Sequence, residues 1–129
     1  MKKVLVIDDS ETVRQQVALA LRGTVFTVVQ APDGIDGLAR AFAERDISLV
    51  LLDLNMPRMN GLDVLDRLRA DPRTRDLPVL ILTTEVERHM IERAKKAGAK
   101  AWLIKPVKPQ MLVEVVTKLC LPDRPRLNA

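Results

Sequence analysis

Five short apolar runs recur along the chain, and this repetition limits the possible folds more than any other feature. The runs are rich in Val, Ile and Leu, and they occupy residues 4–7, 25–29, 47–52, 79–82 and 101–104. Most of them are too short for helices, and they lack the strict polar alternation of a strand with one exposed face. They therefore indicate strands that are covered on both faces, as in a parallel sheet.

A segment with helical periodicity follows each run. Ser10 stands where the first helix needs an N-cap, Gly23 where that helix stops, Gly98 where the fourth helix stops, and Pro109 in the first turn of the fifth. The apolar positions expected to face the sheet are Val13, Val17, Ala20 and Leu21; Ile35, Leu38, Ala39 and Phe42; Leu62, Leu65 and Leu68; Val86, Met90, Ala94 and Ala97; and Leu112, Val115, Val116 and Leu119. This alternation predicts an α/β fold with right-handed βαβ crossovers and five helices on both faces of a five-stranded parallel sheet.

The composition fits a single folded domain. The chain has 129 residues, of which 47% are hydrophobic and 29% charged, and single domains commonly have about 100 to 150 residues. Aromatic residues make up only 2%, so aliphatic side chains must fill the core. We expect residues 1–121 to form the domain and residues 122–129, which are polar and rich in proline, to form a C-terminal tail.

The same sequence argues against export, membrane insertion and nucleic-acid binding. The apolar run after Lys3 stops at Asp8, and no stretch reaches the roughly 18 apolar residues that a membrane helix needs. A single cysteine, Cys120, excludes an internal disulfide. The net charge of +4 comes from scattered basic residues, with no Tyr and one Trp for base stacking. We expect a soluble cytoplasmic protein with a solvated basic surface.

Polar side chains follow four of the five predicted strands, at the point where each strand ends. They are Asp8 and Asp9 after the first strand, Asp53 after the third, Thr83 after the fourth and Lys105 after the fifth. The second strand ends in Gln-Ala-Pro (30–32) and offers no comparable group. Because ligands of open α/β sheets bind outside the carboxyl ends of the strands, we expect these side chains to meet at one edge.

Three carboxylates at one edge repel one another unless a cation compensates their charge. Oxygen ligands without nearby His or Cys favour a hard ion, and so small a carboxylate set favours Mg²⁺, with Mn²⁺ as a substitute. Beside such an ion Asp53 can attack a phosphoryl group and form an acyl phosphate, with Lys105 as a second positive charge and Thr83 as a hydrogen-bond donor. No Gly-rich nucleotide loop occurs, so the phosphoryl group must come from another molecule.

Each of these elements also has a plain structural explanation. Asp8 and Asp9 could complement a helix dipole, Thr83 could cap a helix, and Lys105 with Pro106 could form a surface turn. Their joint occurrence, in this order and at one edge of the sheet, favours a functional site.

Four motifs resemble the receiver domain of two-component response regulators, and most of all the stand-alone, CheY-like chemotaxis type. They are Val-Leu-Val-Ile-Asp-Asp-Ser (4–10), Leu-Leu-Asp-Leu-Asn-Met-Pro-Arg-Met-Asn-Gly (51–61), Leu-Thr-Thr-Glu (82–85) and Gly-Ala-Lys-Ala-Trp-Leu-Ile-Lys-Pro (98–106). The likeness runs from residue 2 to residue 119. It implies the flavodoxin-like strand order 2-1-3-4-5.

The resemblance also implies a role for each site residue. Asp53 is the phosphoacceptor, Asp9 a direct metal ligand, Asp8 a ligand directly or through water, Asn55 a ligand through its backbone carbonyl, and Thr83 and Lys105 contact the phosphoryl group. The donor is a phosphohistidine of a CheA-like sensor histidine kinase. Such a domain is not an ordinary enzyme, because it catalyses only its own phosphorylation and dephosphorylation.

Output in this family involves the face of the fourth helix, fifth strand and fifth helix. Trp102 matches the family's switch aromatic, and strand parity places it on the side of the fifth strand opposite Lys105. The resemblance implies a monomer that controls a partner such as a flagellar motor switch component, or one that drains phosphoryl groups from a shared kinase. Thr84, Trp102 and Val107 depart from the commonest family residues, and His89 is expected at the surface.

Two other functions remain open from the sequence. The chain could be the receiver part of a DNA-binding regulator, although no helix-turn-helix follows Leu121. It could also be a phosphohydrolase with an aspartyl nucleophile, but enzymes of the haloacid-dehalogenase type carry Asp-x-Asp after the first strand, where this chain has Asp8-Asp9-Ser10.

Overall fold

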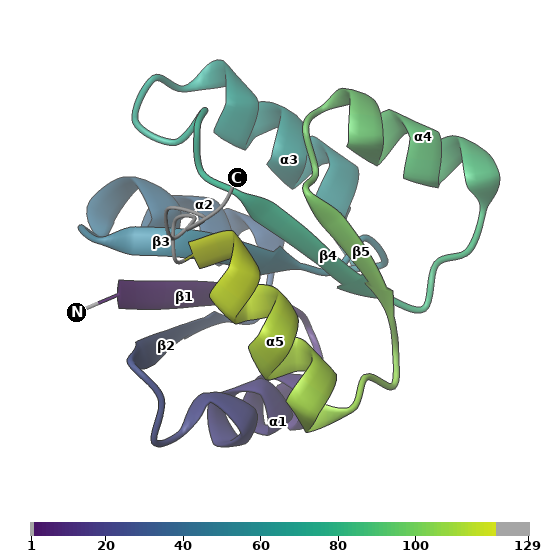
Figure 1. Ribbon diagram of the computed structural model, residues 1–129. Coiled ribbons are helices and arrows are strands. Elements are labelled where there is room, and N and C mark those ends of the chain that lie inside the picture. Colours follow the sequence, from purple (N-terminus) through teal and green to yellow (C-terminus); the bar gives the residue numbers. More distant parts are fainter. Residues whose placement is uncertain (1, 121–129) are drawn as a thin grey trace, which may run out of the picture.

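The computed structural model describes residues 2–120, and its centre is a five-stranded parallel sheet (Figure 1). The strands are β1 (Lys2–Ile7), β2 (Phe26–Ala31), β3 (Ile47–Leu52), β4 (Val79–Thr83) and β5 (Ala101–Ile104). Their order in the sheet is β2-β1-β3-β4-β5, and every neighbouring pair is parallel. The predicted fold class and strand order are confirmed. The predicted tail, residues 122–129, lies outside the described residues.

Five helices connect and flank these strands. They are α1 (Glu11–Leu21), α2 (Gly34–Ala43), α3 (Gly61–Ala70), α4 (Arg88–Lys96) and α5 (Pro109–Cys120). The predicted N-cap is confirmed, since Oγ of Ser10 accepts a hydrogen bond of 3.2 Å from the backbone N–H of Val13. Gly23 and Gly98 follow the ends of α1 and α4 with φ angles of 79° and 88°, which residues with a side chain rarely adopt.

The sheet separates two hydrophobic cores. Side chains alternate along β1, so that Val4 and Val6 face a core with α1 and α5, whereas Leu5 and Ile7 face a core with α2, α3 and α4. Figure 1 shows this arrangement, with α1 and α5 together on one side of the sheet and the other three helices on the opposite side. Because both faces are covered, residues 4–7 of β1, 49–52 of β3 and 79–82 of β4 are all aliphatic and buried.

Val25 and Val86 lie outside the elements to which the sequence assigned them, and both are exposed. Val25 is 62% exposed and precedes β2, and that strand continues to Ala31. Val86 is 69% exposed and precedes α4, which begins at Arg88. Both residues lie in the connection next to the element they were assigned to, where periodicity alone does not identify the end of an element.

The predicted buried face of α2 is partly wrong. Ile35 is 54% exposed and Ala39 is also exposed, whereas Gly37 and Leu38 are buried. A Cβ atom on Gly37 would lie 2.5 Å from Cδ1 of Ile7, so the bare glycine lets α2 approach the sheet closely. The buried face of α2 therefore includes Gly37, a residue without a side chain, which the pattern of apolar residues does not reveal.

Across residues 2–120, no helix has the length and apolar character required to span a membrane.

Candidate functional site

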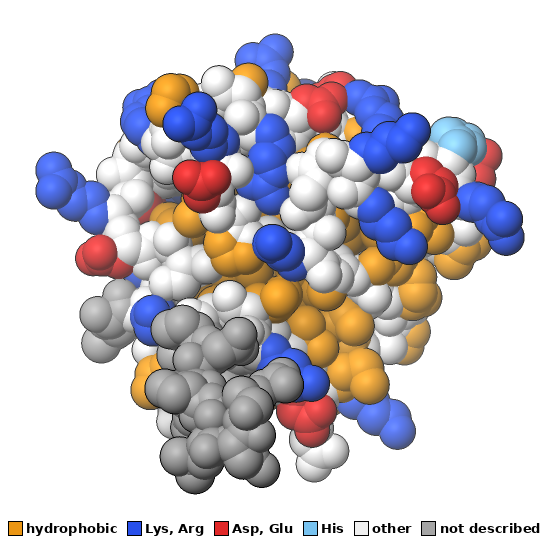
Figure 2. Space-filling model, turned by 45° about the horizontal axis from the view of Figure 1, so that its top comes forward, with side chains coloured by type: hydrophobic (Ala, Val, Ile, Leu, Met, Phe, Trp, Pro, Cys, Tyr) orange, Lys and Arg blue, Asp and Glu red, His pale blue; other side chains and the backbone are white. Residues whose placement is uncertain are grey.

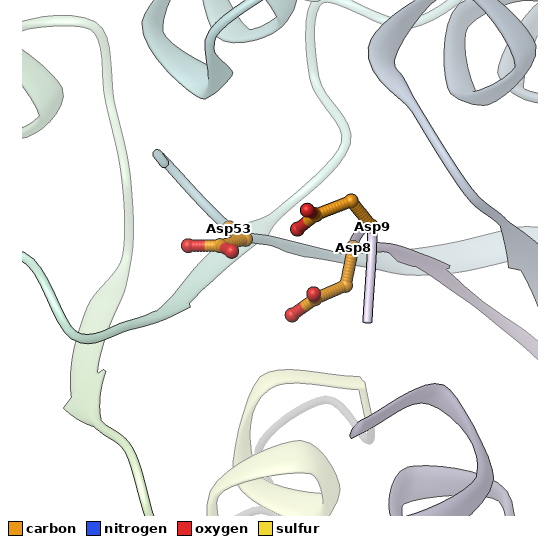
Figure 3. Close-up of side chains that lie close together, drawn as sticks. All are labelled: Asp8, Asp9 and Asp53. Atoms are coloured by element: carbon orange, nitrogen blue, oxygen red, sulfur yellow. The ribbon is translucent and has the colours of Figure 1, made fainter. Parts of the chain in front are cut away.

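Three carboxylates gather at the carboxyl ends of β1 and β3 (Figure 3). Asp8 and Asp9 follow β1, and Asp53 follows β3, its neighbour in the sheet. One carboxylate oxygen from each residue lies within 4.8 Å of the other two. Asp8 is 2% exposed and Asp53 4%, whereas Asp9 is exposed to solvent. These three side chains therefore meet at one edge of the sheet, as predicted.

Lys105 reaches the same cluster from beyond the end of β5. Its Nζ atom lies 2.6 Å from Oδ2 of Asp8 and 3.2 Å from Oδ2 of Asp53. The backbone N–H of Lys105 donates to the carbonyl of Thr83 at 2.9 Å, which fixes the chain after β5 against the end of β4. One ammonium group therefore stands between the two buried carboxylates.

Burial acts on the pKa values of Asp8 and Lys105. Burial raises the pKa of Asp8 above its ordinary value, and the hydrogen bonds from Lys105 and from the backbone of Ser10 only partly oppose that rise. Burial alone would lower the pKa of Lys105, but the hydrogen bond to Asp8 and the charge of Asp53 outweigh it and raise that pKa. The charged form of Lys105 is thus held by its two acidic neighbours.

The three carboxylates differ in how strongly they are already bound. Oδ1 of Asp8 accepts a hydrogen bond of 2.9 Å from the backbone N–H of Ser10, in addition to the contact with Lys105. Oδ1 of Asp53 accepts a bond of 3.1 Å from the backbone N–H of Asn55. Within residues 2–120, no hydrogen bond or ion pair engages the carboxylate of Asp9. Asp9 is therefore the carboxylate with the most freedom to bind an ion.

Thr83, the last residue of β4, is fully buried. Its Oγ1 accepts a hydrogen bond of 3.1 Å from the backbone N–H of Glu85, and Oε2 of Glu85 accepts one of 2.9 Å from the N–H of Glu87, the N-cap residue of α4. The hydroxyl proton of Thr83 is not used in that bond and is available for donation. The start of α4 is thus connected to the end of β4 through Thr83.

Trp102 lies on the side of β5 predicted by strand parity. It packs against the core of α2, α3 and α4, while its neighbour Leu103 packs against the core of α1 and α5. The indole Nε1 of Trp102 is buried and has no hydrogen-bond partner among the residues that the structure describes. Trp102 therefore does not contact the acidic cluster through its polar atom.

Two residues that shape the site, Gly61 and Arg14, were not predicted from the sequence. A Cβ atom on Gly61 would overlap the backbone carbonyl of Asp53, so only glycine lets α3 begin so close to the loop after β3. Arg14 donates from Nη1 to the backbone carbonyl of Asp8 at 2.7 Å. Arg14 lies three positions before the buried Val17 and therefore on the same side of α1. A charged residue on the buried side of a helix was the sequence feature that could have identified it.

Comparison with known proteins agrees with this geometry. Residues 4–117 match the response regulator receiver domain. The chain belongs to this family. Chemotaxis protein CheY1 of Helicobacter pylori is 36% identical over 113 residues, which are 87% of this chain and 91% of that protein.

Solved structures share the fold across nearly the whole chain. Chemotaxis protein CheY4 of Vibrio cholerae has a TM-score of 0.85 at 34% identity, covering 92% of this chain and 98% of that one. The Mn²⁺-bound form of response regulator Rcp1 has a TM-score of 0.84 at 20% identity, covering 96% and 98%. The protein is therefore a receiver domain that closely resembles CheY proteins, and a signalling domain rather than an ordinary catalyst.

Proposed function

We propose that Asp53 accepts a phosphoryl group from the phosphohistidine of a sensor kinase, in a reaction that depends on Mg²⁺. The observation that carries this proposal is the cluster of three carboxylates within 4.8 Å of one another, with Lys105 between Asp8 and Asp53. The cluster bears more negative charge than one lysine can balance, and its donors are all oxygens. Such a set suits a hard divalent ion.

Asp9, Asp53 and the backbone carbonyl of Asn55 are our candidates for direct metal ligands. Asp9 is exposed and its carboxylate is not otherwise engaged, whereas both oxygens of Asp8 are occupied, one of them at 2.6 Å from Lys105. We therefore assign Asp8 a contact with the ion through water. When bound, the ion would neutralise charge on the transferred phosphoryl group. Mn²⁺ is expected to substitute for Mg²⁺, since both ions prefer oxygen ligands.

The remaining groups act on the phosphoryl group itself. A carboxylate oxygen of Asp53 forms the new bond to phosphorus while the bond from phosphorus to the imidazole nitrogen of the donor breaks. Lys105 supplies a positive charge next to Asp53, and Thr83 can donate its free hydroxyl proton to a phosphoryl oxygen. Hydrolysis of the acyl phosphate by water returns Asp53 to its carboxylate form.

Output would follow through the face of α4, β5 and α5, in keeping with the resemblance to CheY proteins. Ile104 is 45% exposed and Met111 49% exposed on β5 and α5. Figure 2 shows apolar side chains gathered below a border of Lys and Arg, in the region where Figure 1 has β5 between α4 and α5. We propose that a monomer acts through this face on a cytoplasmic partner in chemotaxis, such as a flagellar motor switch component.

Acetyl phosphate with Mg²⁺ tests the assignment of the acceptor. Intact mass should show one added phosphoryl group on the wild-type protein and none on Asp53→Asn. The matched control is Asp36→Asn, which changes an exposed acid on α2 and should label normally. Labelling of Asp53→Asn at the wild-type level would show that another residue is the acceptor.

A further inference from the structure

The side chain of Arg14 connects three elements beside the acidic cluster. From the first turn of α1, its Nη1 donates to the backbone carbonyl of Asp8 at 2.7 Å. Its Nε donates to Oε1 of Gln30 at 3.3 Å. Gln30 belongs to β2, so one guanidinium links α1, the end of β1 and the neighbouring strand. The phosphoryl chemistry described above does not use this group.

The carbonyl that Arg14 binds belongs to the peptide unit joining Asp8 to Asp9. A peptide unit is planar, so holding this carbonyl also fixes the direction of the bond from the amide nitrogen to Cα of Asp9. The other polar groups of Asp8 are already held, because its backbone N–H donates to Ala31 at 3.1 Å and its carboxylate binds Ser10 and Lys105. Arg14 completes the set of contacts that fix this residue.

Asp9 has no comparable support of its own. It is exposed, and no partner within residues 2–120 engages its carboxylate. Its approach to Asp53 therefore depends on the two peptide units that flank it. The N–H of Ser10 holds the following unit through its bond to Asp8, and Arg14 holds the preceding one. We propose that Arg14, anchored by Gln30, is a positioning residue that presents Asp9 to the divalent cation. This inference rests on the metal site proposed above.

A role of Arg14 through its charge and a role through positioning predict opposite effects of its removal on the affinity for Mg²⁺. The guanidinium is a positive charge close to the cluster, and as a charge it opposes the binding of a cation. If Arg14 acted only through its charge, Arg14→Met would bind Mg²⁺ more tightly. If Arg14 positions Asp9, the same variant binds Mg²⁺ more weakly, because the carboxylate is no longer held ready for the ion. The sign of the change decides between the two.

The experiment is a Mg²⁺ titration without a phosphoryl donor, in which binding is measured by calorimetry and by the fluorescence of Trp102. We expect Arg14→Met to raise the dissociation constant for Mg²⁺ roughly tenfold. Arg14→Lys keeps the charge but donates to one partner at a time, so its dissociation constant should fall between those of wild type and Arg14→Met. Gln30→Met keeps the arginine and its bond to the carbonyl of Asp8 but removes its anchor, and should weaken binding by less than the roughly tenfold loss of Arg14→Met.

Coupling between the two residues provides a further check. Since Arg14 and Gln30 act through one contact, the double variant should bind Mg²⁺ about as weakly as Arg14→Met alone. The matched control is Arg22→Met, which removes an exposed arginine at the other end of α1 and should leave the dissociation constant unchanged. Should Arg14→Met fail to fold, Gln30→Met and Arg14→Lys carry the same test.

The possible failures are distinguishable. A wild-type protein without measurable Mg²⁺ affinity at millimolar concentration would overturn the proposed metal site itself. A wild-type protein that binds Mg²⁺ together with an Arg14→Met variant that binds equally or more tightly would overturn only the positioning role. A purely structural role would lower the unfolding free energy in EDTA and leave the Mg²⁺ affinity of the folded variant unchanged, and this result would also contradict the inference.

Discussion

Replacing Lys105 with Met should destabilise the metal-free protein. The side chain of Lys105 is 16% exposed and lies between the carboxylates of Asp8 and Asp53, whose side chains are 3% and 5% exposed. Methionine keeps most of the aliphatic volume, so the change removes chiefly the charge. Removing one partner of a buried ion pair costs about 3–5 kcal/mol. We expect a value of about 3 kcal/mol at pH 7, because Asp8 can take up a proton and limit the loss.

The pH dependence of this loss follows from Asp8. Burial already raises its pKa, and without Lys105 that pKa rises further. A carboxyl group whose pKa is higher in the folded than in the unfolded state loses stability as the pH rises from the unfolded value through the folded one. The deficit of Lys105→Met should therefore be largest at neutral pH and shrink as the pH falls toward the ordinary value of 3.8.

Urea unfolding in EDTA at pH 7 and at pH 4 measures both effects. Lys108→Met is the matched control, since Lys108 is an exposed lysine a few residues further along the chain. The same variant should bind Mg²⁺ at least about tenfold more tightly, because a competing positive charge is gone. An unfolding free energy equal to that of wild type at pH 7, or a deficit that grows at pH 4, would refute the electrostatic reasoning.

Three further predictions concern the scaffold and its lone thiol. Gly37→Ala should cost about 1–3 kcal/mol of unfolding free energy, because its Cβ would lie 2.5 Å from Cδ1 of the buried Ile7. Adding Ile7→Val removes that atom and should restore part of the loss, and a strictly additive double variant would contradict the contact. Arg69 donates to the carbonyls of Ala97, Arg75, Leu77 and Gly98 at 2.8 to 3.2 Å, so Arg69→Met should lose about 2–3 kcal/mol in urea unfolding, with Arg69→Lys in between. An unchanged midpoint for Arg69→Met would count against this. Burial raises the pKa of the Cys120 thiol to about 11 from an ordinary 9.0, so iodoacetamide should react with the native protein at pH 9 roughly fifty-fold more slowly than with the unfolded chain. Equal rates would show that the thiol is not protected, and the same shift means that stability falls as the pH rises from 9.0 toward 11.

Much of the fold could be predicted because its signals are local. The aliphatic runs at 47–52 and 101–104 coincide with β3 and β5, and Ser10 caps α1 as its position suggested. A strand buried on both faces is apolar at nearly every position, so its burial can be recognised from the sequence. The exposed Ile35 and Val86 are the counterexamples, since an apolar residue beside a periodic segment need not be buried.

The site divides in the same way. The rule that parallel strands end at one edge was enough to predict that Asp8, Asp53 and Lys105 lie together. It did not indicate which oxygen faces which donor. The bond between Lys105 and Asp8 joins residues 97 positions apart, and its length depends on how β1, β3, β4 and β5 pack side by side.

The sequence by itself thus determined the alternation of strands and helices, the edge at which the polar residues collect and the family to which the motifs point. Only the tertiary structure decided that Lys105 stands between two carboxylates and that the carboxylate of Asp9 has no partner among the described residues. It also decided that Arg14 holds the peptide unit between Asp8 and Asp9. The reason is physical. Periodicity reflects each residue's own burial, whereas these contacts depend on distances between strands and helices that pack only in the folded chain.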